Sequence, residues 1–137
     1  MTTKIFKLDD QLKQDCFTIV DLDLCKVLLM NESQFPWVIL VPCYPDITEI
    51  CQLNDEQQFQ LQTESNLISE ILLNQYPNCT LNIAKLGNIV SQLHIHHIVR
   101  FSGDASWPAP IWGNYKAKPY LLAEIDEKIT FWQSRLA

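Results

Sequence analysis

The first third of the chain predicts three β-strands separated by short polar connections. Residues 16–20, 25–30 and 37–42 are rich in β-branched, aromatic and other apolar side chains, a composition that favours strands. Residues 21–23 carry two aspartates, and residues 31–36 are mostly polar and end in proline, so we expect a turn and a loop there. The third strand is apolar at every position, which indicates a central place in the sheet with both faces covered.

Three other segments repeat apolar residues at the spacing of an α-helix. A short helix is predicted near residues 8–14, where two leucines lie four positions apart. Asn54 is suited to an N-cap, and the helix that follows it should run to about Gln75. Pro119 suits the first turn of a last helix over about 119–135. The predicted buried faces comprise Leu61, Ser65, Ile68, Ile71 and Leu72 in the long helix and Leu121, Ile125, Ile129, Trp132 and Leu136 in the last one.

Two further strands complete the predicted domain. They cover residues 81–86 and 93–101, with the turn dipeptide Gly87-Asn88 after the first, and a proline-containing loop follows over 102–118. Short connections between successive strands favour an antiparallel sheet. The order helix, three strands, helix, two strands, helix therefore predicts an α+β fold. All 137 residues fit one domain of ordinary size.

Composition restricts the kind of partner that the chain can bind. The net charge is −6, whereas proteins that bind nucleic-acid polymers usually carry a basic face, so we expect no such partner. A small phosphate ligand is still possible, because imidazoles and local dipoles can hold it. Charged residues make up 19% of the chain, below the roughly 25% of typical soluble domains. That shortage of surface charge hints at an oligomer.

The cysteines and the first residues of the chain bear on its compartment. Five cysteines are present, an odd number, and none forms a CxxC pair, so we expect free thiols in a reducing environment. The first residues lack the apolar stretch of a signal peptide, and the longest apolar run is too short to span a bilayer. These features predict a cytoplasmic protein that does not contact a membrane.

All three histidines of the chain lie in one stretch of four residues, 94–97, on a single predicted strand. Side chains alternate along a strand, so Gln92, His94 and His96 should line one face, and His97 should lie on the opposite, mostly apolar face. Alternate side chains on a strand lie roughly 7 Å apart. One imidazole could then attack a phosphorus atom while the next donates a hydrogen bond to the phosphate oxygens. The attacking ring needs an acceptor, such as a backbone carbonyl, to fix its tautomer.

Two other interpretations of the histidine cluster remain open. Histidines on a strand are often structural, and His97 suits that role or an interface role. His94 and His96 could also chelate zinc, but Cys43 or a carboxylate would have to supply a third ligand, and no ligand spacing supports it. We expect neither a metal nor another cofactor.

Residues 86–100, LGNIVSQLHIHHIVR, resemble the signature of the histidine-triad (HIT) family. In that signature, three histidines alternate with hydrophobic residues on a strand that follows a glycine turn. The resemblance extends to Asn31 and the strand after it, and it covers roughly residues 16–115. The motif QLHIHH at 92–97 is similar to that of a bacterial sub-branch of the family. The resemblance implies a HIT-like, five-stranded, mainly antiparallel sheet with flanking helices, extended across a homodimer.

The resemblance also implies a role for each matching residue. The middle histidine, His94, is the nucleophile, and His96 contacts the phosphate. Gln92 stands at the position of the first histidine. The other matches are substrate-binding positions: Asn31 at the ribose, Asn82 near the phosphate, Gly87 and Asn88 in the turn, and Trp107 in a Trp-Pro segment that reaches toward the partner subunit's site.

Three positions depart from the family pattern. Gln92 can form hydrogen bonds but cannot titrate. Ile89 replaces a position that often carries Ser or Thr and offers a hydroxyl to the leaving group. His97 fills a slot that is normally hydrophobic. These departures affect protonation of the leaving group more than nucleophilic attack.

Together these observations predict two-step nucleotidyl transfer. His94 would attack the α-phosphorus of a nucleoside phosphoramidate or dinucleoside polyphosphate, and water would then hydrolyse the nucleotidyl-histidine. His96, Asn82 and backbone amides near Gln92 would stabilise the developing charge. We expect the base in an apolar pocket that includes Phe17 or Leu29. The alternatives are a nucleotide-binding sensor with little turnover and a metal-binding or purely structural dimer.

Overall fold

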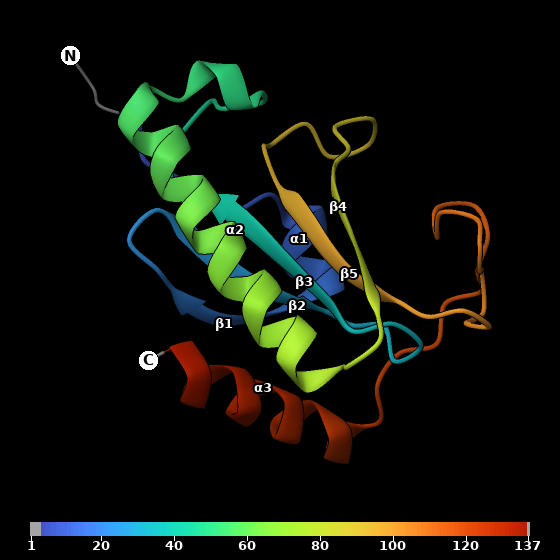
Figure 1. The fold of residues 1–137 in the computed structure, drawn as a ribbon. Helices are drawn as coiled ribbons and strands as arrows, with labels where there is room; N and C mark the ends of the chain where they lie inside the picture. The colour runs from blue at the N-terminus through green and yellow to red at the C-terminus, as the bar shows by residue number, and fades with distance from the viewer. Residues whose placement is uncertain (1–3, 137) are drawn as a thin grey trace.

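A computed structural model describes residues 4–136 of the chain and shows an α+β arrangement (Figure 1). None of the helices within these residues is both long enough and apolar enough to cross a membrane. The elements in chain order are α1 (Asp10–Asp15), β1 (Cys16–Asp21), β2 (Cys25–Met30), β3 (Trp37–Pro42), the 3-10 helix η1 (Ile50–Gln52), α2 (Asp55–Gln75), β4 (Thr80–Lys85), β5 (Ile95–Arg100) and α3 (Leu122–Leu136).

The five strands form one antiparallel sheet in the order β1-β2-β3-β5-β4. The predicted class and the central place of the third strand are therefore confirmed. All six residues of β3 are buried, as are all six of β5, because elements cover both faces of the sheet there. β5 enters the sheet between β3 and β4, so the histidines lie in its interior rather than at an edge.

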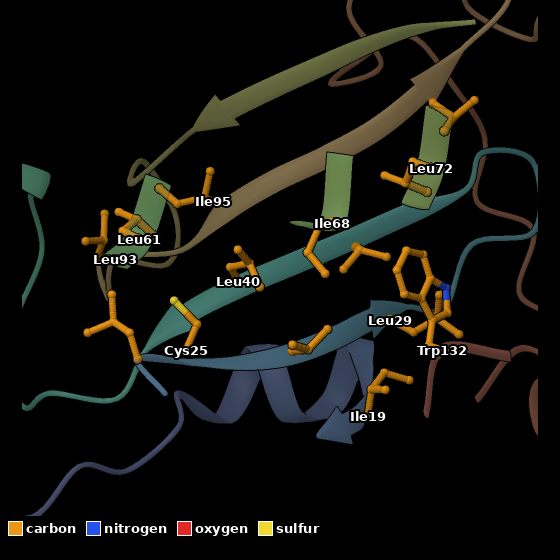
Figure 2. Close-up of a cluster of buried hydrophobic side chains, with 14 of the residues drawn as sticks. Ile19, Cys25, Leu29, Leu40, Leu61, Ile68, Leu72, Leu93, Ile95 and Trp132 are labelled. Carbon is orange, nitrogen blue, oxygen red and sulfur yellow. The ribbon is translucent and has the colours of Figure 1, made fainter. Parts of the chain in front are cut away.

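One face of the sheet packs against α2 and α3; in Figure 1, α2 crosses the sheet, and α3 lies beside its β1 edge. Asn54 caps α2 as predicted: its side chain accepts a hydrogen bond from the N–H of Gln57, whose side chain accepts one from Asn54 N–H. Leu61, Ile68 and Leu72 of the predicted face of α2 are buried against the sheet (Figure 2). Ser65 is buried as well, whereas Ile71 is only half-buried. The core on this face includes Ile19, Cys25, Leu29, Leu40, Leu61, Ile68, Leu72, Leu93, Ile95 and Trp132.

The opposite face carries a second apolar cluster and is only partly covered. The short helix α1 lies on this face, together with residues from the long loop after β5. The buried members are Leu8, Leu12, Leu28, Phe35, Trp37, Ile39, Val41, Ile98 and Ile111. Because α1 has only six residues, it leaves part of the face open. A cavity lies in that opening.

The predicted element boundaries differ from the observed ones by up to three residues, and two of these differences have a clear cause. β5 begins at Ile95 rather than at residue 93, because the N–H of Leu93 donates to the carbonyl of Ile47 instead of joining the strand ladder. The last helix begins at Leu122, three residues after Pro119, so Leu121, which was predicted on its buried face, lies outside the helix and is exposed. The segment before it is held against residues 31–34, where the N–H of Tyr120 donates to the Asn31 side chain. That contact keeps the chain extended and delays the helix.

Candidate active site

His94 and His96 lie side by side at the wall of a cavity of about 400 Å³. Their ring centroids are 4.9 Å apart, and the ring planes are inclined at 76°. Both residues are more than nine-tenths buried. Alternation along the chain therefore places both imidazoles on the predicted face, and the cavity lies on the side of the sheet opposite α2. Two imidazoles in one small cavity can act together on a single ligand group.

The backbone fixes the tautomer of His94. Its Nδ1 lies 2.7 Å from the carbonyl oxygen of Gln92, which can only accept, so Nδ1 carries the proton in the neutral ring. The lone pair is then on Nε2, on the cavity side of the ring. This is the arrangement that a nucleophilic imidazole requires. The sequence predicted an acceptor such as a backbone carbonyl, and the carbonyl of Gln92 is that acceptor.

A tryptophan fixes the tautomer of His96. The indole Nε1–H of Trp37 donates a hydrogen bond of 2.9 Å to Nδ1 of His96, so in the neutral ring the proton is on Nε2. Burial lowers the pKa of His96 most, the neighbouring His94 and His97 add to that effect, and together they bring it to about 3. His96 is therefore a neutral hydrogen-bond donor at physiological pH. Among the described residues, no protein group bonds Nε2 of either His94 or His96.

The rest of the cavity is mostly apolar and aromatic. Trp112 packs edge-on against His96 with centroids 5.1 Å apart. The Gln11 side chain donates a 2.9 Å hydrogen bond to the carboxylate of Asp15, and both residues belong to α1. Apart from the two histidines, the polar side chains of the wall are Gln11, Asp15, Asn88 and Tyr115, and the apolar ones are Leu12, Met30, Trp37, Ile39, Leu86, Ile89, Val90 and Trp112.

Gln92 is not among the residues that line this cavity. Its Oε1 accepts a hydrogen bond from the N–H of Asp9, and its Nε2 donates to the carbonyl of Lys7, both at 2.9 Å. Alternation holds for His94, which directly precedes β5. It failed for Gln92, because the N–H of Leu93 bonds to the Ile47 carbonyl and the chain has left the sheet there. The side chain anchors the N-terminal segment, and only its carbonyl serves His94.

Asn31 and Asn82 are likewise engaged outside the cavity. The Oδ1 of Asn31 accepts from Tyr120 N–H, and that of Asn82 accepts from Nη1 of Arg100 at 2.9 Å. Arg100 is buried and also makes a two-pronged ion pair with Asp104, with N–O distances of 2.8 and 3.0 Å. Asn31 therefore holds the segment before α3, and Asn82 of β4 holds the buried Arg100 at the end of β5.

Of the remaining predicted binding residues, Asn88 lines the cavity and Gly87 lies next to it in the chain. Trp107 is 40% exposed and lies near Arg100 rather than in the cavity wall. The expected base-pocket residues, Phe17 and Leu29, face the other side of the sheet with α2 and α3, so that expectation was wrong. β-Strand alternation explains the error, because Met30, next to Leu29, lines the cavity instead.

His97 lies on the opposite face, as predicted. Its Nε2 is 2.7 Å from the Ser65 hydroxyl of α2, and its Nδ1 is 3.2 Å from the Ile95 carbonyl. Burial lowers the pKa of His97 to about 4. It is thus a neutral, hydrogen-bonded core residue. Within residues 4–136, no group of three or more His, Cys, Asp or Glu side chains could hold a metal ion.

The sequence did not reveal most residues of the cavity wall, among them Trp37, Trp112 and Asp15. Trp37 shares a face of β3 with Ile39, which is paired with His96 in the sheet. Its contact with His96 could have been found once the pairing of the two strands was known. Trp112 lies in a loop without periodicity, and Asp15 ends a short helix, so neither carried a signal in the sequence.

An antiparallel five-stranded sheet with two alternate histidines beside a partly aromatic cavity defines the histidine-triad class of α+β protein. The HIT domain family matches residues 11–103. The chain belongs to the HIT family, whose members are commonly nucleotide-binding hydrolases or transferases.

Solved structures agree with this assignment. A histidine triad protein from Bradyrhizobium japonicum is 40% identical, with 98% of this chain and 100% of that chain covered and a TM-score of 0.93. One from Marinobacter aquaeolei is 41% identical, with 97% of each chain covered and a TM-score of 0.93. One from Sinorhizobium meliloti is 40% identical, with 96% and 94% covered and a TM-score of 0.86. A search of the curated proteins found no significant match.

Proposed function

We propose that the protein is a nucleotide hydrolase or nucleotidyl transferase that works through a nucleotidyl-His94 intermediate. One observation carries the proposal: His94 turns an unprotonated Nε2 to the cavity beside the Nε2–H of His96. A lone pair and a hydrogen-bond donor at one end of a cavity suit attack on a phosphorus atom and stabilisation of its oxygens.

The cavity suggests how a nucleotide lies in it. Its volume of about 400 Å³ is within the usual range for small-molecule sites. The phosphate would lie at the two histidines, and the nucleoside would lie along the apolar wall toward α1. There the Asp15 carboxylate, held by Gln11, offers an acceptor to hydrogen-bond donors of the nucleoside. In this proposal Asp15 takes a recognition role that the family resemblance gave to Asn31.

The reaction would take place in two steps. His94 attacks the α-phosphorus, and the bond to the leaving group breaks. The imidazolium that forms keeps its Nδ1–H, which the Gln92 carbonyl accepts. Water then displaces the nucleotide from Nε2. The substrates expected from the family are dinucleoside polyphosphates and nucleoside phosphoramidates.

A single-turnover experiment tests this function. The protein is mixed with diadenosine tetraphosphate or an adenosine phosphoramidate, and mass spectrometry searches for an adenylyl group on His94. We expect a burst of leaving group and an adduct that His94→Ala abolishes. His97→Gln is the matched control, because it removes a histidine from the opposite face of the sheet. Turnover that survives in His94→Ala would overturn the mechanism.

A nucleotide sensor with little turnover is the second candidate. The engagement of the Gln92 side chain by the N-terminal segment favours it, because no titratable group then replaces the first histidine of the family. Binding of AMP by calorimetry with neither burst nor adduct would establish the sensor.

We also propose that two copies form a homodimer across β4. This strand lies at the edge of the sheet, and Ile83 on it is 51% exposed. Pairing of two such edges would satisfy backbone groups and cover apolar surface. Light scattering that gives twice the mass of 15.9 kDa supports the dimer, and the monomer mass contradicts it.

A further inference from the structure

We infer that the site acts on nucleotides whose leaving group departs as a stable anion, such as phosphoanhydrides and acyl-phosphate mixed anhydrides, in preference to alkyl phosphoramidates. The inference rests on the proposed function and narrows its substrate class. A phosphate or carboxylate anion can leave without a proton. An alkylamine must leave as the neutral amine and needs a proton for cleavage of the P–N bond. Among residues 4–136, the cavity wall carries no group suited to supply that proton.

Gln92 cannot supply it. An amide does not titrate in the physiological range, and both ends of this amide are already used by the backbone of the N-terminal segment. Reorientation toward the cavity would break two hydrogen bonds. In one, Oε1 of Gln92 accepts from Asp9 N–H, and in the other its Nε2 donates to the Lys7 carbonyl. The side chain therefore lacks both the chemistry and the freedom to act on the leaving group.

His96 cannot supply it either. The hydrogen bond from Trp37 occupies its Nδ1, and burial beside two other imidazoles keeps the ring neutral. The indole of Trp37 donates a hydrogen bond but does not give up its proton, so it cannot protonate Nδ1 of His96. Loss of the remaining Nε2 proton would leave an imidazolate. His96 thus stabilises charge through a hydrogen bond but does not transfer its proton.

The other polar groups of the wall are poor acids or acceptors. Burial raises the pKa of the Tyr115 phenol, and the nearby carboxylates of Glu32 and Asp15 raise it further, which weakens it as an acid. Asp15 accepts a hydrogen bond from Gln11. Ile89, 93% exposed on the rim of the cavity, presents only hydrocarbon. Asn88 carries an amide that cannot titrate.

When the leaving group is an anion, attack by His94 and hydrolysis of the adduct both proceed without a proton donor from the protein. The lone pair of His94 Nε2 forms the N–P bond, and the bond from phosphorus to the bridging oxygen breaks with its electron pair on that oxygen. In hydrolysis, the water oxygen bonds to phosphorus, and the N–P electrons return to Nε2. One water proton passes to solvent, and the other stays on the product phosphate until that group ionises.

A pair of aryl esters of AMP tests the inference. The 4-nitrophenyl and phenyl esters are similar in shape but differ strongly in the stability of the departing phenolate. A general acid would offset the lower stability of the phenolate anion, and such an acid contributes roughly 10²–10⁴-fold to the rate. Without one, the first-turnover rate should fall about 100-fold or more from the nitrophenyl to the phenyl ester. The n-propyl phosphoramidate of AMP should be slower still. Rates for the two esters within about tenfold of each other would overturn the inference.

Two variants sharpen the test. Gln92→His removes the amide that bonds to Asp9 and Lys7 and introduces an imidazole that is free to turn to the cavity. We expect it to raise phosphoramidate turnover relative to that of the nitrophenyl ester at least tenfold. Tyr115→Phe should leave the ratio of the two ester rates unchanged. If the phenyl ester slows more than the nitrophenyl ester in this variant, the phenol acts as an acid, and the inference is overturned. If Gln92→His fails to fold, the ester ratio of the unaltered protein decides alone.

The outcomes separate the two proposals. Release of nitrophenol with a His94 adduct supports the proposed function whatever the ester ratio, and that ratio then decides the leaving group. Absence of release from every substrate contradicts both proposals.

Discussion

The indole N–H of Trp37 points at Nδ1 of His96 across two neighbouring strands, and the 2.9 Å hydrogen bond selects which nitrogen of His96 faces the cavity. Both residues are almost fully buried, so water does not compete for this bond. The neighbouring His94 is held by the Gln92 carbonyl in the opposite tautomer. His94 thus presents a nitrogen with a free lone pair to the cavity, and His96 presents an N–H, although the two side chains are chemically identical.

Replacement of Trp37 by Phe should remove the donor and keep most of the packing. We expect the first-turnover rate with the nitrophenyl ester of AMP to fall about tenfold, the equivalent of one lost hydrogen bond. Nitrogen NMR of His96 supplies a direct readout: Nε2–H alone in the unaltered protein and a mixture of tautomers in Trp37→Phe. A variant that keeps the Nε2–H tautomer would show that the indole does not set it.

The part of the site that sequence predicted is the part that local geometry determines. Alternation along a strand depends only on the backbone, so it placed His94 and His96 on one face and His97 on the other. The same rule failed for Gln92, because the chain leaves the sheet at Leu93, whose N–H donates to Ile47, whereas His94, directly before β5, still shares a face with His96. The partners of the Gln92 side chain lie 83 and 85 positions away in the chain. Contacts of that separation leave no local pattern.

The fold was predicted well for a similar reason. Strong apolar runs and a capped amphipathic helix fix β1 to β5 and α2 with little help from distant residues. The loop over 102–118 has no repeat, so its prolines and tryptophans did not reveal that Trp112, rather than Trp107, turns to the cavity. Tertiary packing alone selects between the two.

His97 makes the protein sensitive to acid. Its pKa is about 4 in the folded chain and about 6.5 when unfolded, so the unfolded chain binds the proton first as pH falls. The free energy of unfolding should therefore decrease between about pH 6.5 and pH 4. Between pH 7 and pH 4.5 this one group accounts for about 2 kcal/mol. His96 acts in the same direction.

Urea unfolding of His97→Gln at the two pH values measures that share. Glutamine can still bond to Ser65 but cannot titrate, so the variant should lose about 2 kcal/mol less than the unaltered protein on acidification. Equal losses would mean that His97 does not titrate in this window.

Glu64 should stabilise the fold through the turn between β1 and β2. Its buried carboxylate accepts hydrogen bonds of 2.8 Å from the N–H groups of Leu24 and Cys25 and one of 2.6 Å from the Gln60 side chain. In Glu64→Gln an amide NH₂ replaces one acceptor and faces a backbone donor. We expect unfolding in urea to show a loss of about 1.5–3 kcal/mol. Glu70→Gln, on an exposed position of the same helix, should change the value by less than about 0.5 kcal/mol. Similar losses in both variants would contradict a specific role for Glu64.

Asp15 should contribute to nucleotide affinity rather than to chemistry, because its carboxylate lines the cavity on α1, whereas the two histidines carry the reacting nitrogens. In Asp15→Asn one acceptor oxygen becomes a donor, and it would then face the donors of the bound nucleoside. We expect KM for the nitrophenyl ester to rise about tenfold, while kcat changes by less than about threefold, as loss of uniform binding requires. Asp10→Asn, on an exposed position of the same helix, controls for the loss of one negative charge. A fall in kcat at unchanged KM would instead place Asp15 at the reacting phosphate, and the orientation proposed for the nucleotide would then have to be reversed.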